Sequence, residues 1–240
     1  MRIIKHSLLS ISLIIGLLFA CGCVEDKPID ITTVSSNLSQ LADDKSRNGS
    51  IKEALSYYDA VINLNETDPE IWLKIAFLLS NETIDNEAIS SFTRVLELDP
   101  ENSTALIGRG ATYVRQDLLP DALDDLNKAT QVDPYNAKTH EGLADVYYAM
   151  GDTESALTEY GIAINLSPRA SNVYRKQAEL LYGAGRYNEA AKAFDNALKI
   201  NRSDAHSWQR LGEMLRLSDR LEEAAIAYGQ LNKLVPDNPE

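Results

Sequence analysis

The sequence predicts an all-α protein built from six copies of one helical hairpin. The first observation is a repeat of 34 residues that runs without an insertion from residue 35 to residue 238. The second is the spacing of apolar residues within each copy, which recur three and four residues apart, as on one face of a helix. The third is the position of turn-forming residues, because Gly49, Gly151 and Gly185 fall between the halves of their copies. Each copy is therefore expected to form two helices joined by a short turn.

Three sets of positions define the register of the repeat. Bulky residues recur at Leu38, Trp72, Leu106, His140, Tyr174 and Trp208. Alanines keep the same step at Ala54, Ala88, Ala122, Ala156, Ala190 and Ala224, and each is followed four residues later by Tyr58, Phe92, Leu126, Tyr160, Phe194 and Tyr228. The six copies are residues 35–68, 69–102, 103–136, 137–170, 171–204 and 205–238. We expect all these positions, His140 included, to be packed core, because one hairpin cannot hide both its apolar stripes and must stack on the next.

The first helix of the last copy carries W-x2-L-G, the second begins with A-x3-Y, and a proline ends four of the copies. These motifs resemble the tetratricopeptide repeat (TPR). The resemblance covers residues 35–238 and implies a right-handed α-solenoid of six 34-residue helix-turn-helix units. It also implies a concave groove, lined by the first helices, that receives a protein or peptide. Local departures are Lys45 at an apolar position and Glu66 and Arg202 in place of the terminal proline.

The sequence indicates which side chains point into that groove. Positions one, five and eight after each bulky residue fall beside the packing stripe of a helix, and in the second and third copies they are mostly apolar. Exposed apolar patches often mark binding sites. The predicted peptide-binding residues are Leu73, Lys74, Phe77, Ile107, Ala111, Val114, Arg115, Tyr148 and Tyr182. In the alternative interpretation, Ile29, Ile31 and Val34 fold back and cover this strip.

Residues 1–23 predict an export signal, because a basic start is followed by an apolar run and small residues. Residues 18–21 resemble the lipobox of prokaryotic lipoproteins, which predicts lipidation of Cys21 or, in a second register, of Cys23. The alternatives are a plain secretory signal and an uncleaved membrane helix. The two cysteines are too close for a C-x-x-C redox motif and lack the partners of a zinc site. Residues 24–34 are predicted to be a tether.

All three interpretations of the N-terminal segment imply that the repeats are exported. We therefore expect an extracytoplasmic protein that is anchored to the cell membrane or, alternatively, secreted. N-x-[ST] triplets are more frequent than the roughly two expected by chance, which favours an archaeal cell surface. The candidate glycosylation sites are Asn37, Asn48, Asn65, Asn81, Asn102 and Asn201; a seventh, Asn165, is weakened by Pro168.

Composition and motifs argue against several functions. A net charge of −13 disfavours nucleic-acid binding, and the sequence shows no nucleophile elbow, phosphate loop, metal-ligand spacing or cofactor motif. The best catalytic candidate, Glu141 with Asp145, is a like-charge pair more typical of a solvated helix face. We therefore predict a non-catalytic adaptor, with a structural subunit of an envelope or pilus-type assembly as the alternative and an enzyme as the third.

The end of the repeat array predicts a further contact. No copy follows the sixth, which leaves part of an apolar stripe unpaired at Tyr228, Leu231, Leu234 and Val235. Self-association through this last helix is therefore expected as one way to cover it.

Overall fold

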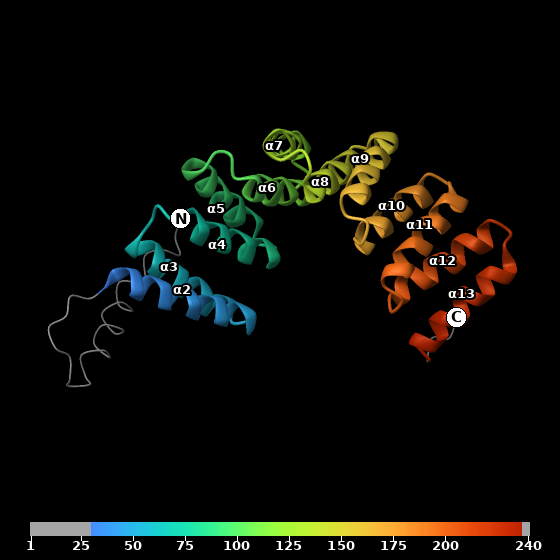
Figure 1. Cartoon of the computed structure of the whole chain (residues 1–240), viewed down its shortest axis with the longest axis horizontal. Helices are drawn as coiled ribbons and strands as arrows, with labels where there is room; N and C mark the ends of the chain where they lie inside the picture. The colour runs from blue at the N-terminus through green and yellow to red at the C-terminus, as the bar shows by residue number, and fades with distance from the viewer. Residues whose placement is uncertain (1–29, 237–240) are drawn as a thin grey trace. The chain divides into compact units, whose positions relative to one another are not determined.

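The structure is a computed structural model that describes residues 30–236, and within this range every regular element is an α-helix. The predicted all-α helical-repeat fold is confirmed, because the helices pair as hairpins in the predicted register (Figure 1). The pairs are α2 (Ile31–Arg47) with α3 (Ile51–Leu64), α4 (Pro69–Asn81) with α5 (Asp85–Leu98), α6 (Ser103–Arg115) with α7 (Leu119–Val132), α8 (Ala137–Ala149) with α9 (Thr153–Leu166), α10 (Ser171–Gly183) with α11 (Tyr187–Ile200), and α12 (Ala205–Leu217) with α13 (Leu221–Leu234). The predicted signal and both cysteines lie outside the described residues.

The first helix begins earlier than the predicted boundary between tether and repeats. α2 starts at Ile31, so residues 31–34 are helical. Asp30 caps this helix by accepting a hydrogen bond from the backbone N–H of Thr32 at 3.0 Å. Its carboxylate also accepts from the hydroxyls of Thr32 and Thr33, and these side-chain bonds lower the pKa of Asp30 to about 2. An aspartate N-cap satisfies N–H groups that the first turn leaves open, which explains the earlier start.

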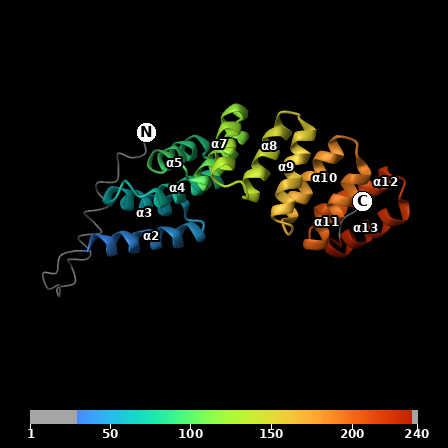
Figure 2. The same cartoon turned by 45° about the horizontal axis from the view of Figure 1, so that its top comes forward.

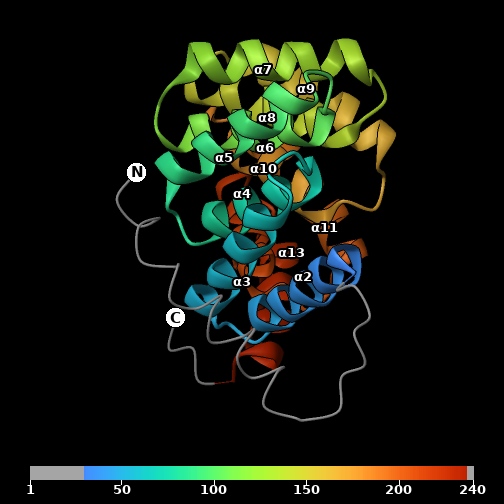
Figure 3. The same cartoon turned by 90° about the vertical axis from the view of Figure 1, so that its left-hand side faces the viewer.

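The chain divides within α6 into two compact units, the first ending at Ala105 and the second starting at Leu106. In the first unit, α2 lies beside α3 and α4 beside α5 (Figure 2). Figure 3, turned by 90° about the vertical axis from Figure 1, again shows α2 and α3 as neighbours. In the second unit, α8 with α9, α10 with α11 and α12 with α13 form the hairpins. No helix among residues 30–236 combines the length and apolar character that a membrane crossing requires.

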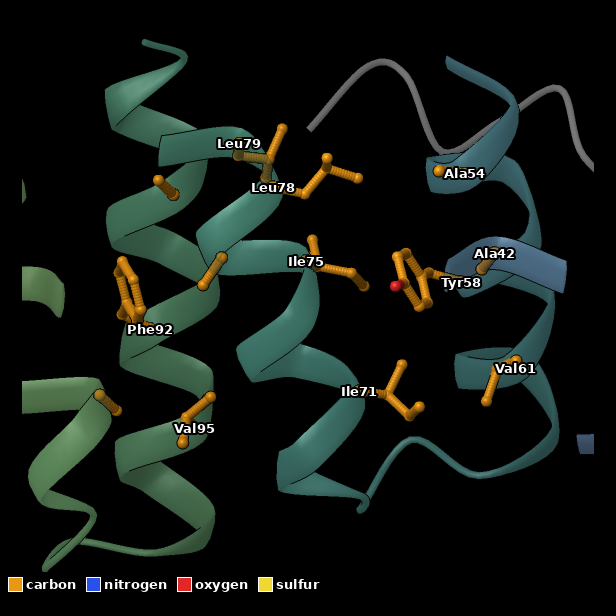
Figure 4. Close-up of a cluster of buried hydrophobic side chains, with 13 residues drawn as sticks. Ala42, Ala54, Tyr58, Val61, Ile71, Ile75, Leu78, Leu79, Phe92 and Val95 are labelled. Atoms are coloured by element: carbon orange, nitrogen blue, oxygen red, sulfur yellow. The ribbon is translucent and has the colours of Figure 1, made fainter. Parts of the chain in front are cut away.

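The core of the first unit is built from the repeated alanine and aromatic positions. Ala54 of α3 is fully buried, and one turn later Tyr58 points toward Ile75 of α4 (Figure 4). On the other side of α4, Phe92 and Val95 of α5 are also fully buried. The small alanine lets paired helices approach, and the large side chain four residues later fills the space between hairpins.

The second unit repeats this arrangement. Its buried clusters are centred on the same register positions, namely Ala122 with Leu126, Ala156 with Tyr160, and Ala190 with Phe194. The last helix departs in part from the predicted open stripe, because Leu231 is buried and Tyr228 packs on the core. Leu234 and Val235 stay exposed at its end. The unpaired stripe is thus smaller than the sequence predicts.

A ring N–H fixes the first helix of three repeats in place. Trp72 Nε1 donates to the carbonyl of Glu66 at 3.0 Å, and Trp208 Nε1 donates to the carbonyl of Arg202 at 2.9 Å. In the equivalent position, His140 Nε2 lies 3.0 Å from the carbonyl of Pro134. His140 is only 7% exposed, which confirms the predicted core role.

The turn inside each hairpin contains one residue with a positive φ angle. These residues are Gly49, Thr83, Asp117, Gly151, Gly185 and Asp219, spaced by the repeat period. The sequence analysis predicts a turn at the three glycines only. Asp117 and Asp219 are also turn-compatible residues, because aspartate tolerates the left-handed region better than most side chains. Thr83, at φ 58, is the most strained, because a β-branched residue is poorly tolerated in the left-handed region.

We expect Thr83→Gly to stabilise the protein. Glycine adopts the left-handed conformation without strain, which removes about 1–2 kcal/mol, whereas its greater loss of conformational entropy costs about 0.5–1 kcal/mol. The free energy of unfolding should therefore rise by about 1 kcal/mol. Urea denaturation followed by circular dichroism measures it. The reciprocal control Gly185→Thr should destabilise the protein; a loss of stability in Thr83→Gly would contradict the strain.

Two helical glycines should respond in opposite ways to alanine. A Cβ atom on Gly212 would lie 2.7–2.9 Å from ring atoms of Tyr228, whereas one on Gly161 of α9 would have nothing within 4 Å. Gly212→Ala should therefore cost about 1–3 kcal/mol through overpacking. Gly161→Ala should gain up to about 1 kcal/mol from helix propensity. Denaturation of both variants, measured in parallel, checks this contrast.

Candidate peptide-binding surface

Ion pairs join the first helices of neighbouring repeats at one repeated position. We call these pairs the ion-pair ladder: Asp43 with Lys74 at 2.9 Å, Asp145 with Lys176 at 2.6 Å, and Glu179 with Arg210 at 2.5 Å. In each pair the cation follows the acid by 31 residues. Sequence reasoning missed this ladder, although a search for opposite charges at that fixed step would have found it.

A buried tyrosine completes two steps of the ladder. Tyr58 donates its hydroxyl to Asp43 at 2.5 Å, and Tyr160 donates to Asp145 at 2.6 Å. Burial, together with the neighbouring carboxylate, raises the pKa of both phenols, so each stays a hydrogen-bond donor. The acids are therefore held by a neutral donor from their own repeat and a cation from the next.

The ladder also accounts for the predicted catalytic candidate. Lys176 contacts Glu141 at 2.8 Å as well as Asp145 at 2.6 Å, so one cation neutralises the like-charge pair. Burial opposes the charge of Lys176, but the two carboxylates outweigh it and raise the lysine pKa. This geometry is that of a structural ion pair that links two repeats.

Further along the second unit, charges cover a predicted contact residue. The Arg210 guanidinium lies 4.4 Å from the centroid of the Tyr182 ring and binds Glu179 and Glu213. Burial favours the neutral form of Glu179, but hydrogen bonds from Arg210 and His206 dominate and lower its pKa. Tyr182 is thus partly buried under a cation–π contact, which leaves less of its ring open than the sequence predicts.

The ladder is interrupted in the second and third repeats. Phe77 and Ala111 stand where the other repeats place an acid, and the residues 31 positions later are Gly108 and Gly142. Neither member of such a pair carries a charge, so these two positions form no ion pair. Apolar groups replace the ladder at the repeats where the sequence predicts binding.

In the first unit, three predicted residues occupy this face of α4. Phe77 is 37% exposed, and its ring meets the ring of Phe92 edge-on with centroids 5.2 Å apart. Leu73 is partly buried against the core of the unit. Lys74 is engaged by Asp43 and lies 3.4 Å from the hydroxyl of Ser39, so its charge is satisfied within the ladder.

The N-terminal residues that could have covered the apolar strip lie elsewhere in the structure. Ile31 is 58% exposed and lines a pocket of about 570 Å³ with Ser39, Asp43, Ile71 and Lys74, between α2 and α4. Phe77 is not among the residues that line this pocket, and its ring stays 37% exposed. Ile29 lies outside the described residues.

In the second unit, the predicted residues differ in exposure. Ile107 and Val114 of α6 are partly buried against that unit's core, whereas Ala111 between them is exposed. Arg115 is exposed, with a guanidinium nitrogen 3.4 Å from the Thr112 hydroxyl. Tyr148 is the most open aromatic of the predicted set, at 56%.

The candidate glycosylation asparagines are mostly accessible. Five of the six are exposed, and Asn102 is half-buried because its side chain accepts from the backbone N–H of Ala105. In two triplets the hydroxyl residue bonds the asparagine itself, Thr67 to Asn65 and Ser203 to Asn201, each at 2.8 Å.

Comparison with known proteins agrees with this architecture. A family model described as tetratricopeptide repeat matches residues 86–137, 141–187 and 175–239, together more than half of the chain. The chain therefore belongs to the tetratricopeptide repeat family. A search of curated proteins finds no significant match.

Solved structures show the same fold. A protein described as PilW, a widely conserved type IV pilus biogenesis factor, superposes with a TM-score of 0.76 at 16% identity, over 86% of this chain and 96% of its own. Pseudomonas aeruginosa pilF superposes with a TM-score of 0.72 at 19% identity, over 87% and 95%. YrrB, described as a TPR protein with an unusual peptide-binding site, gives 0.57 at 22% identity, over 75% and 93%.

A double-mutant cycle on Asp145→Asn and Lys176→Met tests the ladder. Partly exposed ion pairs contribute modestly, so we expect a coupling of about 1 kcal/mol. Lys176→Met alone should destabilise more than Asp145→Asn, because it leaves Glu141 and Asp145 facing each other without a cation. Denaturant unfolding of the four proteins measures the coupling; additive effects would contradict a direct interaction.

Proposed function

We propose that this chain is a non-catalytic, membrane-anchored, extracytoplasmic adaptor that binds a protein or peptide on the exposed side of its first helices. We call this surface the first-helix face; it comprises Phe77 in the first unit and Ala111 and Tyr148 in the second. The observation that carries the proposal is the interruption of the ion-pair ladder. Phe77 keeps an exposed aromatic ring where other repeats hold an acid paired to the next repeat. Folds of this family bind peptide or protein partners.

The chemistry of the face suggests the kind of segment it takes. Phe77 offers an apolar ring whose edge is already oriented by Phe92, so little side-chain freedom is lost on binding. Tyr148 offers a ring and a hydroxyl, which suits the boundary between apolar and polar parts of a partner. Within each unit the ladder acids and cations border these residues and would select against mismatched charge. A segment that presents apolar side chains with few charges fits best.

Membrane attachment is proposed on the sequence alone. Lipidation of Cys21 or Cys23 would place two acyl chains on the protein, and two chains hold a protein far more durably than one. Mass spectrometry of the protein from native membranes would identify the modified cysteine. Cys21→Ser and Cys23→Ser, compared by membrane fractionation, distinguish the two registers; membrane retention of the double variant would favour an uncleaved helix.

A second candidate function is a structural subunit of an envelope or pilus-type assembly. It is favoured by the breadth of the similarity to PilW and pilF, which covers most of both chains in each case. At under 20% identity this similarity concerns the fold, so the assembly itself needs a direct test. A structural subunit would co-purify in fixed stoichiometry with a large complex, whereas an adaptor would exchange its partner.

Site-specific photo-crosslinking in intact cells tests the binding face. We expect benzoylphenylalanine in place of Phe77 or Tyr148 to capture a discrete partner, because both positions are exposed on the proposed face. Tyr135, which is 81% exposed in the loop before α8, is a matched aromatic control that should capture none. Equal capture at all three positions would overturn the proposal.

The variant Phe77→Glu separates binding from packing. With the partner so identified, we expect at least about tenfold weaker binding and little change in melting temperature, because the ring is partly solvated already. A large loss of stability would show that Phe77 serves chiefly to cover Phe92. Tyr135→Glu, measured in parallel, controls for the added charge.

A further inference from the structure

A second pocket lies near the C-terminal end of the described chain, where α11, α12 and α13 converge. It has a volume of about 450 Å³. Leu198, Trp208 and Leu234 supply its apolar lining, and Asp195, Lys199, Arg202, Gln230 and Lys233 supply its polar lining. We call it the Trp208 pocket. It uses none of the residues of the first-helix face, so the two surfaces can be tested independently.

The Trp208 pocket is cationic in an acidic protein. Lys199 pairs with Asp195 at 2.7 Å, one helical turn away. Arg202 and Lys233 have no ion-pair partner among residues 30–236, and they leave the lining with two net positive charges. The whole chain carries −13. Two uncompensated cations beside an indole ring form a local field opposite in sign to that of the protein.

The equivalent positions four repeats earlier carry the opposite net charge, because Asp59, Glu66 and Glu97 outnumber Arg94 there. The fold therefore does not require these cations. Trp72 takes the place of Trp208 and makes the same N–H bond to a carbonyl six residues before it. The positions of Lys199, Arg202 and Lys233 are occupied there by Asn63, Glu66 and Glu97.

Helix-dipole compensation accounts for only part of the difference. Lys199 and Lys233 lie in the last turns of their helices, where cations are favourable. Glu97, however, sits in the last turn of α5 at the position of Lys233, so a cation is dispensable there. Arg202 lies in the loop after α11, beyond the helix end.

We propose that the Trp208 pocket binds an acidic peptide segment of a partner protein. Carboxylates of the segment pair with Arg202, whose guanidinium can hold one in a bidentate arrangement, and with Lys233. An apolar side chain between them lies against Trp208 and Leu234, where it is removed from water. The charge of the lining selects acidic over neutral or basic segments, and the concave apolar lining selects a segment over free anions.

Intrinsic fluorescence can report on this pocket directly. The chain has two tryptophans, so Trp72→Phe leaves Trp208 as the only indole. The full chain with this substitution is titrated with the capped peptide Asp-Glu-Leu-Asp-Glu and with its neutral counterpart Asn-Gln-Leu-Asn-Gln. We expect a saturable change that is at least about tenfold tighter for the acidic peptide and weakens as salt rises, because the rim charges are partly exposed.

Charge variants locate the binding. Arg202→Glu with Lys233→Glu, which introduces the residues of the equivalent positions Glu66 and Glu97, should weaken acidic-peptide binding at least about tenfold, as expected when charge pairs become repulsive. Lys138→Glu with Lys192→Glu makes the same change in net charge at exposed lysines outside the pocket and should leave the affinity within about twofold. If circular dichroism shows that the pocket variant is unfolded, Arg202→Gln with Lys233→Gln replaces it.

Three results would overturn the inference. Equal affinity for the neutral peptide would mean that the pocket recognises apolar groups alone. Unchanged affinity in the pocket variant would place the acidic segment elsewhere on the chain. A concentration-dependent dimer in sedimentation equilibrium, dissociated by the same pocket variant, would make a second copy of the chain the occupant.

Discussion

The whole structure depends on the close approach of two helices at one small residue in each repeat. The six alanines of this position are all at most 4% exposed, and the large residue one turn later fills the space toward the next hairpin. Because each hairpin has two apolar stripes, within each unit it is stable only when its neighbours cover them. Residues outside the apolar packing stripe are not subject to this constraint. They can therefore differ from repeat to repeat.

The ion-pair ladder is the second layer of organisation. Its pairs connect adjacent first helices, and a buried tyrosine hydroxyl orients the acid in two of them. Such partly exposed pairs contribute little to stability individually. Their larger effect is on the surface, because they occupy the first-helix face with satisfied charges. Apolar groups remain open at Phe77 in the first unit and at Ala111 in the second, where the ladder is interrupted. This contrast distinguishes the proposed binding surface of each unit.

The two tryptophans show how one repeat position can acquire different chemical surroundings. Trp72 and Trp208 make the same backbone hydrogen bond and hold the same place in the fold, yet Glu66 and Glu97 occupy the repeat positions that Arg202 and Lys233 occupy beside Trp208. A repeat fold tolerates this divergence because the exposed rim of a pocket contributes little to packing. Two surfaces with different preferences, one apolar and one cationic, can therefore coexist on one chain.

The sequence by itself determined the period, the helices, most of the buried positions and the glycine turns, because each of these depends on local propensity and on burial at fixed spacing. Four of the bulky positions expected in the core are only half-buried, namely Leu38, Trp72, Tyr174 and Trp208. It also identified Phe77 and Tyr148 as exposed. Only the tertiary structure decided which charges meet: Lys74 with Asp43, Lys176 with two acids, and Arg210 over Tyr182. Long side chains from neighbouring repeats can reach several partners. Periodicity therefore predicts on which face of a helix a residue lies, but it does not predict which residue it contacts. The strained turn at Thr83 also depends on the hairpin, which requires a left-handed residue at that position. The early start of α2, by contrast, follows from local capping by Asp30.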